Sequence, residues 1–223
     1  MPNEIKIDKI IRSRRKSIAL VVAPDARLIV RAPMRISLEH IQDLVFRKRF
    51  WIDKKRKQAL KNGRPAKAKE FVDGEEFLYL GETHRLKIES RKDIQLTDYL
   101  YFPAKYLSKA RVKMIEWYKQ KAREKITERV SLVSRLTGWK FKSISITNAQ
   151  TRWGSCGAKG TINFTWKLIM APLGVIDYVA AHELAHTVER NHSARFWSKV
   201  ATVLPDYKTR QRWFKGNRAN FKI

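Results

Sequence analysis

The sequence predicts an α+β fold, with a β-rich part over residues 1–104 that contains one helix, and a small sheet with helices over residues 105–223. Two observations predict this class. Short β-branched and aromatic runs between turn residues fill much of the first hundred residues, and apolar residues at helical spacing dominate the remainder. The composition, 43% hydrophobic and 11% aromatic, is that of a folded globular protein. We expect a domain boundary near Pro103.

The N-terminal part is expected to begin with strands and one helix. The runs KSIALVVA (16–23) and RLIVRAP (27–33) have strand character, and the Pro-Asp-Ala turn signal at 24–26 joins them. Ser37 is placed to cap a helix over residues 38–61, whose apolar side chains recur at roughly helical spacing.

A second group of strands completes the N-terminal part. The NGRP connector at 62–65 precedes FLYLGETHRLKI (77–88), which we interpret as a β-hairpin. DIQLTDYLYFP (93–103) is expected to be a further strand.

The C-terminal part is expected to begin with a long basic amphipathic helix. This helix covers about residues 108–136, and Gly138 is suited to end it. FKSISITN (141–148) alternates as a strand does, and RWGSCGAKGTINFTW (152–166) predicts a hairpin that turns within its Gly-Ala-Lys-Gly segment.

The remaining sequence predicts helices. Pro172 lies where a helix should begin, and VIDYVAAHELAHTVER (175–190) is that helix. Two further helical pieces flank Pro205.

Charge and cysteine content limit the partners and the compartment. The chain has 48 Lys and Arg against 21 Asp and Glu, a formal net charge of +27, which attracts polyanions such as nucleic acid or ribosomes. The basic run from Arg47 onward is either a solvated helix face or, because Phe50 and Trp51 lie among its cations, a surface for nucleic acid. Cys156 is the chain's one cysteine, which excludes an internal disulfide and suits a reducing cytoplasm.

No segment approaches the ~20 apolar residues that are needed to cross a bilayer. The run Ile18 to Ala23 is shorter than the roughly 7–15 residues of a signal-peptide core. We therefore expect a soluble cytoplasmic protein without a membrane partner, and the sequence leaves its oligomeric state open.

The segment AAHELAHTVERNHSARFW (180–197) holds three of the five histidines. By composition, about 0.006 accidental HExxH matches are expected in a chain of this length. His182 and His186 lie one turn apart on a helix face, so both imidazoles can reach one metal ion about 2 Å away. Glu183 lies beside that ion without having to bind it, and it can accept a proton from an activated water.

A third ligand is expected from His192, because a catalytic zinc takes three protein ligands and keeps one position open. Six residues after His186, it cannot stay on the same helix face, so the helix must end and the chain must reverse. Asn191 suits a left-handed turn that ends the helix, and Ser193 can cap the helix that follows. The alternative for each histidine is an ordinary buried core residue.

These segments closely resemble the YgjP-like metallopeptidases, which are related to the SprT-like and WLM proteases. The similarity lies in TRWGSC, INFTWKLIMAP, VIDYVAAHELAH, NHSARFW and LPDYKTRQRWF, and extends upstream to RSRRKSIALVVAPDARLIVRAP and WIDKKRKQ. It implies a compact zincin-like catalytic domain with HELAH on the active-site helix. It also implies one Zn²⁺ per chain, with His192 as third ligand and Glu183 as general base. SprT-like proteins often have a Cys-rich zinc-binding tail, which this sequence lacks, and this weakens the expectation that it shares their DNA-repair role.

The predicted activity is hydrolysis of protein or peptide substrates, including proteins held on nucleic acid or ribosomes. An exposed sheet edge can hold an extended peptide, and the hairpin at 152–166 is the candidate. Its Arg152, Trp153 and Asn163 are candidates to face the substrate, with packing as the alternative for Trp153. Tyr207 is a candidate to stabilise an oxyanion or, equally, to pack the C-terminal helix.

The sequence is also compatible with two other functions. The first is a basic nucleic-acid-binding protein whose zinc site is structural or weakly active, and the second is a metal-dependent hydrolase of small molecules. His40 and His84 lie outside the motif and are expected not to be ligands. Cys156 is expected to be a small buried residue.

Overall fold

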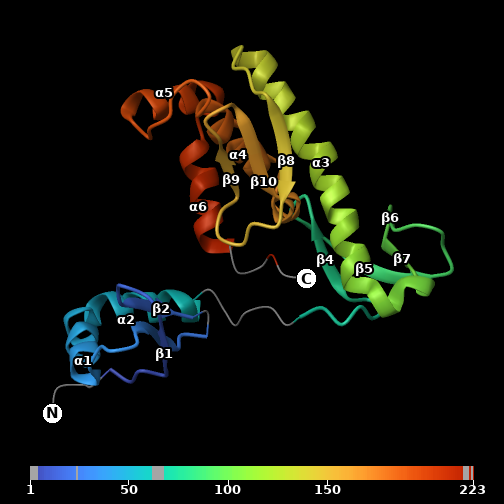
Figure 1. Cartoon of the computed structure of the whole chain (residues 1–223). Helices are drawn as coiled ribbons and strands as arrows, with labels where there is room; N and C mark the ends of the chain where they lie inside the picture. The colour runs from blue at the N-terminus through green and yellow to red at the C-terminus, as the bar shows by residue number, and fades with distance from the viewer. Residues whose placement is uncertain (1–4, 24, 62–67, 218–220, 222) are drawn as a thin grey trace. The chain divides into compact units, whose positions relative to one another are not determined.

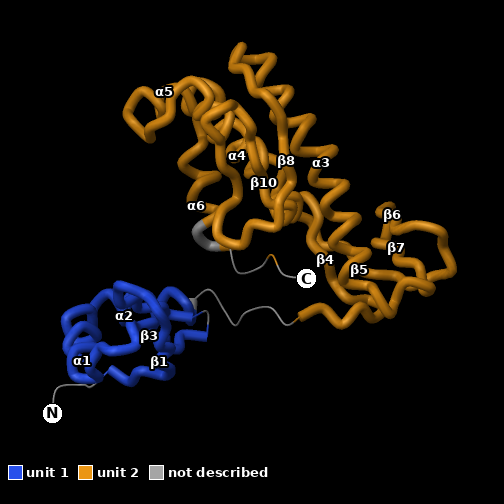
Figure 2. The backbone as a smooth tube through the Cα atoms, viewed as in Figure 1, with its two compact units in different colours: residues 1–67 blue, residues 68–223 orange. Residues whose placement is uncertain are grey.

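A computed structural model describes residues 5–23, 25–61, 68–217, 221 and 223. The chain forms two compact units, Met1–Lys67 and Ala68–Ile223, each with its own hydrophobic core (Figures 1 and 2). Helices and small mixed sheets occur in both units, which confirms the predicted α+β class.

The division at Lys67 corrects the boundary that we expected near Pro103. Phe77 and Phe102, on strands of the presumed N-terminal part, are buried in the same core cluster as Met114 of the long helix that follows. Because these side chains share one core, residues 68–103 fold with the C-terminal part. The connector predicted at 62–65 lies outside the described residues.

The described residues of the first unit form three strands and two helices. Its strands are β1 (Lys9–Ser13), β2 (Ala19–Val22) and β3 (Leu28–Pro33), and its helices are α1 (Leu38–Arg47) and α2 (Arg49–Lys61). Strand β3 lies in the middle of the sheet, parallel to β1 and antiparallel to β2. The single helix that we predicted is therefore two.

The core of the first unit forms where β3 meets the helices. Alternate residues of β3 point inward, as expected for a strand with one buried face. The fully or nearly fully buried side chains are Leu28, Val30, Ala32, Ile41, Val45 and Ile52. Ser37 caps α1 as predicted, because its hydroxyl oxygen accepts a hydrogen bond from the His40 N–H at 3.2 Å. Of the predicted turn at 24–26, Pro24 lies outside the described residues and Ala26 adopts a positive φ of 65°.

The second unit opens with a four-stranded sheet. Strands β4 (Glu76–Tyr79) and β5 (Glu82–Glu89) form the predicted hairpin, while β6 (Gln95–Leu96) and β7 (Leu100–Pro103) follow. The order in the sheet is β4-β5-β7-β6, and β7 runs parallel to β5.

Helix α3 (Ala110–Thr137), which follows a short 3-10 turn, packs along the core of the second unit. Its buried residues recur at three- and four-residue intervals, as expected for a helix with one buried face. They are Ala110, Met114, Trp117, Tyr118, Ala122, Ile126, Val130 and Val133. The helix ends as predicted at Gly138, whose φ of 72° is left-handed and whose N–H donates to the Ser134 carbonyl at 2.8 Å.

A three-stranded sheet follows, formed by β8 (Ser143–Thr147), β9 (Gly154–Cys156) and β10 (Thr161–Thr165). The antiparallel pairing of β9 with β10 confirms the predicted hairpin. Strand β10 lies in the middle, parallel to β8, so β9 is an outer strand of this sheet.

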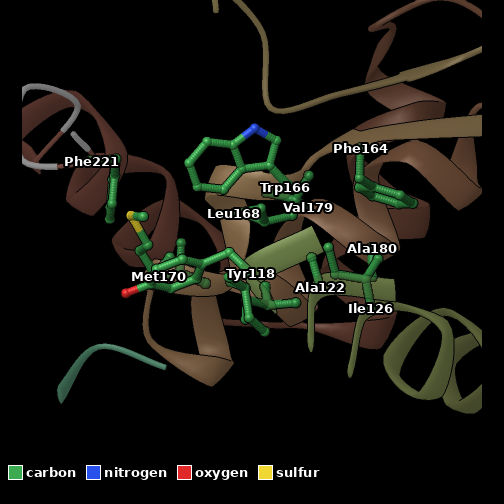
Figure 3. Close-up of a cluster of buried hydrophobic side chains, with 14 of the residues drawn as sticks. Tyr118, Ala122, Ile126, Phe164, Trp166, Leu168, Met170, Val179, Ala180 and Phe221 are labelled. Atoms are coloured by element: carbon green, nitrogen blue, oxygen red, sulfur yellow. The ribbon is translucent and has the colours of Figure 1, made fainter. Parts of the chain in front are cut away.

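Three helices complete the second unit: α4 (Leu173–Ala185), α5 (Ala194–Val203) and α6 (Tyr207–Asn217). Pro172 is the N-cap of α4, as its position predicted, and α5 and α6 flank Pro205. Helix α4 contacts α3, α5, α6 and β9, and it is apolar almost all round, which is typical of a helix in the centre of a domain. Figure 3 shows part of this core, including Ala122, Phe164 and Ala180. Within the described part of the chain, no helix is long and apolar enough to span a bilayer.

The turn between β4 and β5 fixes the start of α4. The N–H groups of Leu80 and Gly81 donate to the carbonyls of Ile169 and Met170 at 2.8 and 3.2 Å. Gly81 has a φ of 89°, and a Cβ there would lie 2.8 Å from Pro172 Cγ and 2.9 Å from its Cα. The turn therefore requires glycine for both its conformation and its close approach to the helix.

Gly81→Ala should destabilise the second unit by about 2–4 kcal/mol, because the left-handed conformation and the overlap with Pro172 both add to the cost. Gly74→Ala is the matched control: its φ is also positive, at 79°, but a Cβ there meets nothing within 4 Å. The control should lose only about 1–2 kcal/mol. Urea unfolding of both variants measures the difference, and equal losses would show that contact with Pro172 does not matter.

Candidate metal centre

Three histidines converge at the C-terminal end of α4. The Nε2 atom of His192 lies 3.1 Å from that of His182 and 3.2 Å from that of His186. The HExxH spacing and the family resemblance had predicted these three histidines. Among the described residues, they form the cluster of side chains that could hold a metal ion. Neither His40, on α1, nor His84, on β5, belongs to it.

The chain reverses earlier than we predicted. Helix α4 ends at Ala185 rather than near residue 190, and the Val188 and Glu189 N–H groups donate to the Ala185 carbonyl at 3.1 and 2.9 Å. The left-handed turn at Asn191 was a wrong prediction, because Asn191 is not among the described residues with positive φ. A tight turn after α4 already provides the reversal.

Two further contacts hold His192 in place. The Arg190 guanidinium donates to the Ala158 carbonyl at 2.9 Å, which ties the returning loop to the β9–β10 hairpin. Ser193 caps α5 as predicted, since its hydroxyl oxygen accepts from the Phe196 N–H at 3.3 Å.

Phe196 forms an apolar support for the histidines that sequence reasoning missed. Its fully buried ring stacks on His186, with centroids 4.5 Å apart, and lies 5.0 Å from His182 and 4.8 Å from His192. The sequence did contain an indication of this role, because Phe196 follows His192 by four residues and lies in the first turn of a helix that Ser193 caps. Such packing orients the imidazoles, because a ring in contact on one face cannot turn freely.

Trp197 and Tyr207 extend this support. The Trp197 ring lies 5.7 Å from both His182 and His192, and Tyr207 stacks on it with centroids 5.2 Å apart and planes at 14°. This stacking favours packing, the second of the two predicted roles of Tyr207.

The imidazoles of His182 and His186 are in a form that suits metal binding. Burial lowers the pKa of His182 to about 3, with the neighbouring His186 and His192 adding to the effect, and burial also lowers the pKa of His186. A neutral ring has a nitrogen lone pair to offer a cation. The Nδ1 of His186 lies 3.1 Å from the Glu189 carbonyl, an arrangement that leaves Nε2 as the ligand atom when Nδ1 carries the proton.

Glu183 lies on the buried side of the same helix turn, with 7% of its surface exposed. Burial raises the pKa of its carboxyl group to about 7, and the charge of Arg152 acts in the opposite direction. A Cβ on Gly154 would lie 2.5 Å from Glu183 Cγ and 2.6 Å from Oε1. Strand β9 can therefore approach the carboxyl group this closely only because residue 154 is glycine.

The three residues expected to face a substrate lie in different surroundings. Arg152 is exposed, and its charge acts on Glu183. Trp153 packs between Phe214 and Phe221, with centroids 4.8 and 5.1 Å away, which favours its packing alternative.

Asn163 is half-buried on β10. Its neighbour Phe164 is buried in the core and pairs with Gly154, the residue that touches Glu183. Because successive residues of a strand point to opposite faces, Asn163 lies on the other face of the sheet and does not join the histidines. Cys156 is half-buried on the face of Glu183, and burial raises the pKa of its thiol.

Comparison with known protein families identifies the family of this chain. A family model described as "YgjP-like, metallopeptidase domain" matches residues 16–217. The chain belongs to the YgjP-like metallopeptidase family. The match includes the three histidines, Glu183 and most of both units, so the chain carries a metal-dependent peptidase domain.

A solved structure is also similar to part of this YgjP-like chain. It is the crystal structure of the metallopeptidase zymogen of Pyrococcus abyssi abylysin, which is 22% identical. The similarity covers 40% of this chain and 91% of that chain, with a TM-score of 0.37. No curated protein matches the chain.

His192→Ala should remove most of the bound metal from this YgjP-like protein, because two imidazoles from one helix turn cannot replace three converging ones. We expect at least the 10–100-fold loss of affinity that is typical when a ligand's supporting group is removed. Elemental analysis of the purified protein, with His40→Ala as control, measures it. Unchanged metal content in His192→Ala would exclude His192 as a ligand.

Proposed function

We propose that this chain is a zinc-dependent peptidase in which His182, His186 and His192 hold one Zn²⁺ and Glu183 is the general base. The observation that carries the proposal is that the Nε2 atoms of His182 and His186 lie 3.1 and 3.2 Å from the Nε2 atom of His192, beside a buried carboxyl group. The family match supports peptide hydrolysis over the hydrolysis of small molecules.

The donor set favours zinc. Imidazole nitrogen suits Zn²⁺, whereas Mg²⁺ and Ca²⁺ prefer oxygen ligands. Structural zinc sites are almost always closed by four protein ligands, and catalytic sites have three with one open position. Three histidines therefore fit a catalytic ion, and the exposed His192 leaves the site accessible to solvent.

The chemistry is divided between the ion and the protein. When bound, Zn²⁺ supplies Lewis-acid polarisation of a peptide carbonyl and of water. The Glu183 carboxylate accepts the proton of the attacking water and donates it to the leaving amine. Its pKa near 7 suits both steps, since a catalytic base works best when its pKa is close to the operating pH. The ring of Phe196 holds the imidazoles in position throughout.

The outer strand β9 is the proposed binding site for an extended peptide. It is an outer strand of its sheet and lies against α4 through the Gly154–Glu183 contact. A peptide can add to such an edge through main-chain hydrogen bonds. Exposed Arg152, two residues before β9, is placed to contact a carbonyl or carboxylate of that peptide. The single, half-buried cysteine supports a cytoplasmic location.

Glu183→Gln tests the proposed base. The amide has nearly the same shape but cannot accept the proton, so kcat for a peptide substrate should fall about 10²–10⁴-fold while the metal content stays the same. Casein or an unstructured peptide library with mass-spectrometric readout provides the substrate. A variant that keeps its metal and its full activity would contradict the role of Glu183.

Gly154→Ala should lower activity without removing the metal, because the added methyl group must displace the Glu183 carboxyl group. We expect at least a tenfold fall in kcat, since a misplacement of about 1 Å can cost about 10²-fold. Gly157→Ala, in the same hairpin, is the control, because its Cβ would come no closer than 3.4 Å to any atom. Equal activity in the two variants would show that the contact is unimportant.

A further inference from the structure

We propose that the exposed side of α2 and the end of α1 form a binding surface for single-stranded nucleic acid. The surface consists of Phe46, Phe50 and Trp51 with Lys54 and Lys57. Helices α1 and α2, which carry these residues, belong to the first unit (Figure 2). The proposal does not depend on peptidase activity or on the metal centre.

The charge of the first unit favours a polyanionic ligand. Residues 1–67 contain 19 Lys and Arg against 6 Asp and Glu. Seven of those cations fall within residues 47–57, where Asp53 is the one acidic residue. A concentration of this kind on one helix attracts the phosphate backbone of a nucleic acid.

One side of α2 packs against the first unit, and the opposite side is exposed. Ile52 is fully buried and Arg56 is half-buried at one-turn spacing, and the Arg56 guanidinium donates to the carbonyls of Lys6 and Ala26 at 2.8 and 3.2 Å. Arg56 therefore has a structural role. Lys54 and Lys57 lie on the opposite, exposed side of the helix.

The exposed aromatic rings favour a ligand with flat faces. Phe46, Phe50 and Trp51 expose 48%, 74% and 41% of their surface, although a monomeric domain usually buries such rings. By helical spacing, Phe50, Lys54 and Lys57 form one row along α2, so ring and cations face the same solvent. Nucleobases stack on aromatic rings while lysines contact the phosphates between them.

The rings are also held in place. The Arg49 guanidinium carbon lies 4.5 Å from the centroids of both Phe46 and Phe50 and so bridges the two rings across the junction of α1 and α2. This arrangement limits rotation of the exposed side chains before any ligand binds. An arginine between two rings offers a further planar surface to a base.

An apolar groove of about 450 Å³ adjoins Phe46. Ile7 and Ile10 line it, together with Lys6 and Gln42. A base lifted from the strand would find apolar walls and one polar group for its edge there. Bases in a duplex are already stacked and paired, so these features favour single strands.

The distribution of side chains argues against a membrane as the ligand. Amphipathic helices that bind membranes have a long apolar face opposite a charged one. On α2, the aromatic residues are confined to the first turn, and Leu60, near its end, is the next large exposed apolar side chain. Between the aromatic residues and Leu60, residues 53–58 are almost all charged.

The test is fluorescence anisotropy of the full-length protein with labelled oligo(dT), oligo(U) and a mixed-sequence duplex over a range of salt. Phe50→Ala/Trp51→Ala should weaken binding of the single strands about tenfold or more and leave duplex binding nearly unchanged. Lys54→Gln/Lys57→Gln should weaken binding to all three. It should also reduce the salt slope for the single strands by about 1.4, or about 0.7 for each phosphate that the variant no longer neutralises.

Matched controls lie in the second unit. Tyr99→Ala removes another exposed ring, and Lys140→Gln/Lys142→Gln removes two other exposed lysines. Neither should change affinity for single strands more than about twofold. Phe50→Leu/Trp51→Leu retains apolar side chains that support folding but removes the aromatic faces, so it should show the same loss as the alanine pair.

Three results would overturn the proposal. The first is unchanged oligonucleotide affinity in both aromatic variants, and the second is an equal loss for the two lysine pairs, which would mean unspecific attraction to a basic protein. The third is binding to phosphatidylserine vesicles that needs Phe50 and Trp51 while oligonucleotide binding does not. Weaker single-strand binding in the variants of this surface but not in the controls, with duplex binding kept in the aromatic variants, would support it.

Discussion

The convergence of three imidazole nitrogens at one end of α4 is the constraint on which the second unit depends. His182 and His186 meet because they lie one turn apart, but His192 joins them only if the helix ends at Ala185 and the chain returns at once. The backbone hydrogen bonds to the Ala185 carbonyl and the Arg190–Ala158 contact make this return. Phe196, placed by the Ser193 cap, then packs against all three rings.

A site of this kind needs a helix that does not move. Helix α4 is enclosed by α3, α5, α6 and β9, and a partly buried ion pair reinforces the enclosure. The Arg129 guanidinium binds both oxygens of Asp177 in α4, and the Arg210 guanidinium donates to the Gly174 carbonyl in its first turn at 2.7 Å. The turn at Gly81 fixes the helix start, so the first half of α4 is held by contacts from distant parts of the chain.

The first unit has its own core and its own distribution of charge. Its inward side is occupied by aliphatic residues and by Arg56, while its helices expose rings and lysines that contribute nothing to that core. Exposed aromatic residues are costly unless they have a use, because water orders around them and other chains can associate with them. The family model begins at residue 16 and therefore includes most of this unit, which makes it part of the family's common architecture.

The sequence by itself determined the features that depend on local spacing. The α+β class, the two hairpins, the caps at Ser37, Gly138 and Ser193, and the pair of histidines one turn apart all follow from patterns of a few residues. His192 was also predicted from sequence, because a catalytic zinc takes three protein ligands and the segment NHSARFW resembles the family's.

Only the tertiary structure decided the features that depend on contacts between distant segments. The unit boundary moved to Lys67 because β4–β7 share a core with α3, and Asn163 faces away from the site because Phe164 occupies the core face. The end of α4, the support from Phe196 and the contact of Gly154 with Glu183 arise in the same way. Local patterns indicate which residues prefer a helix, a strand or a turn. Long-range packing decides where each element ends and which side chains are in contact.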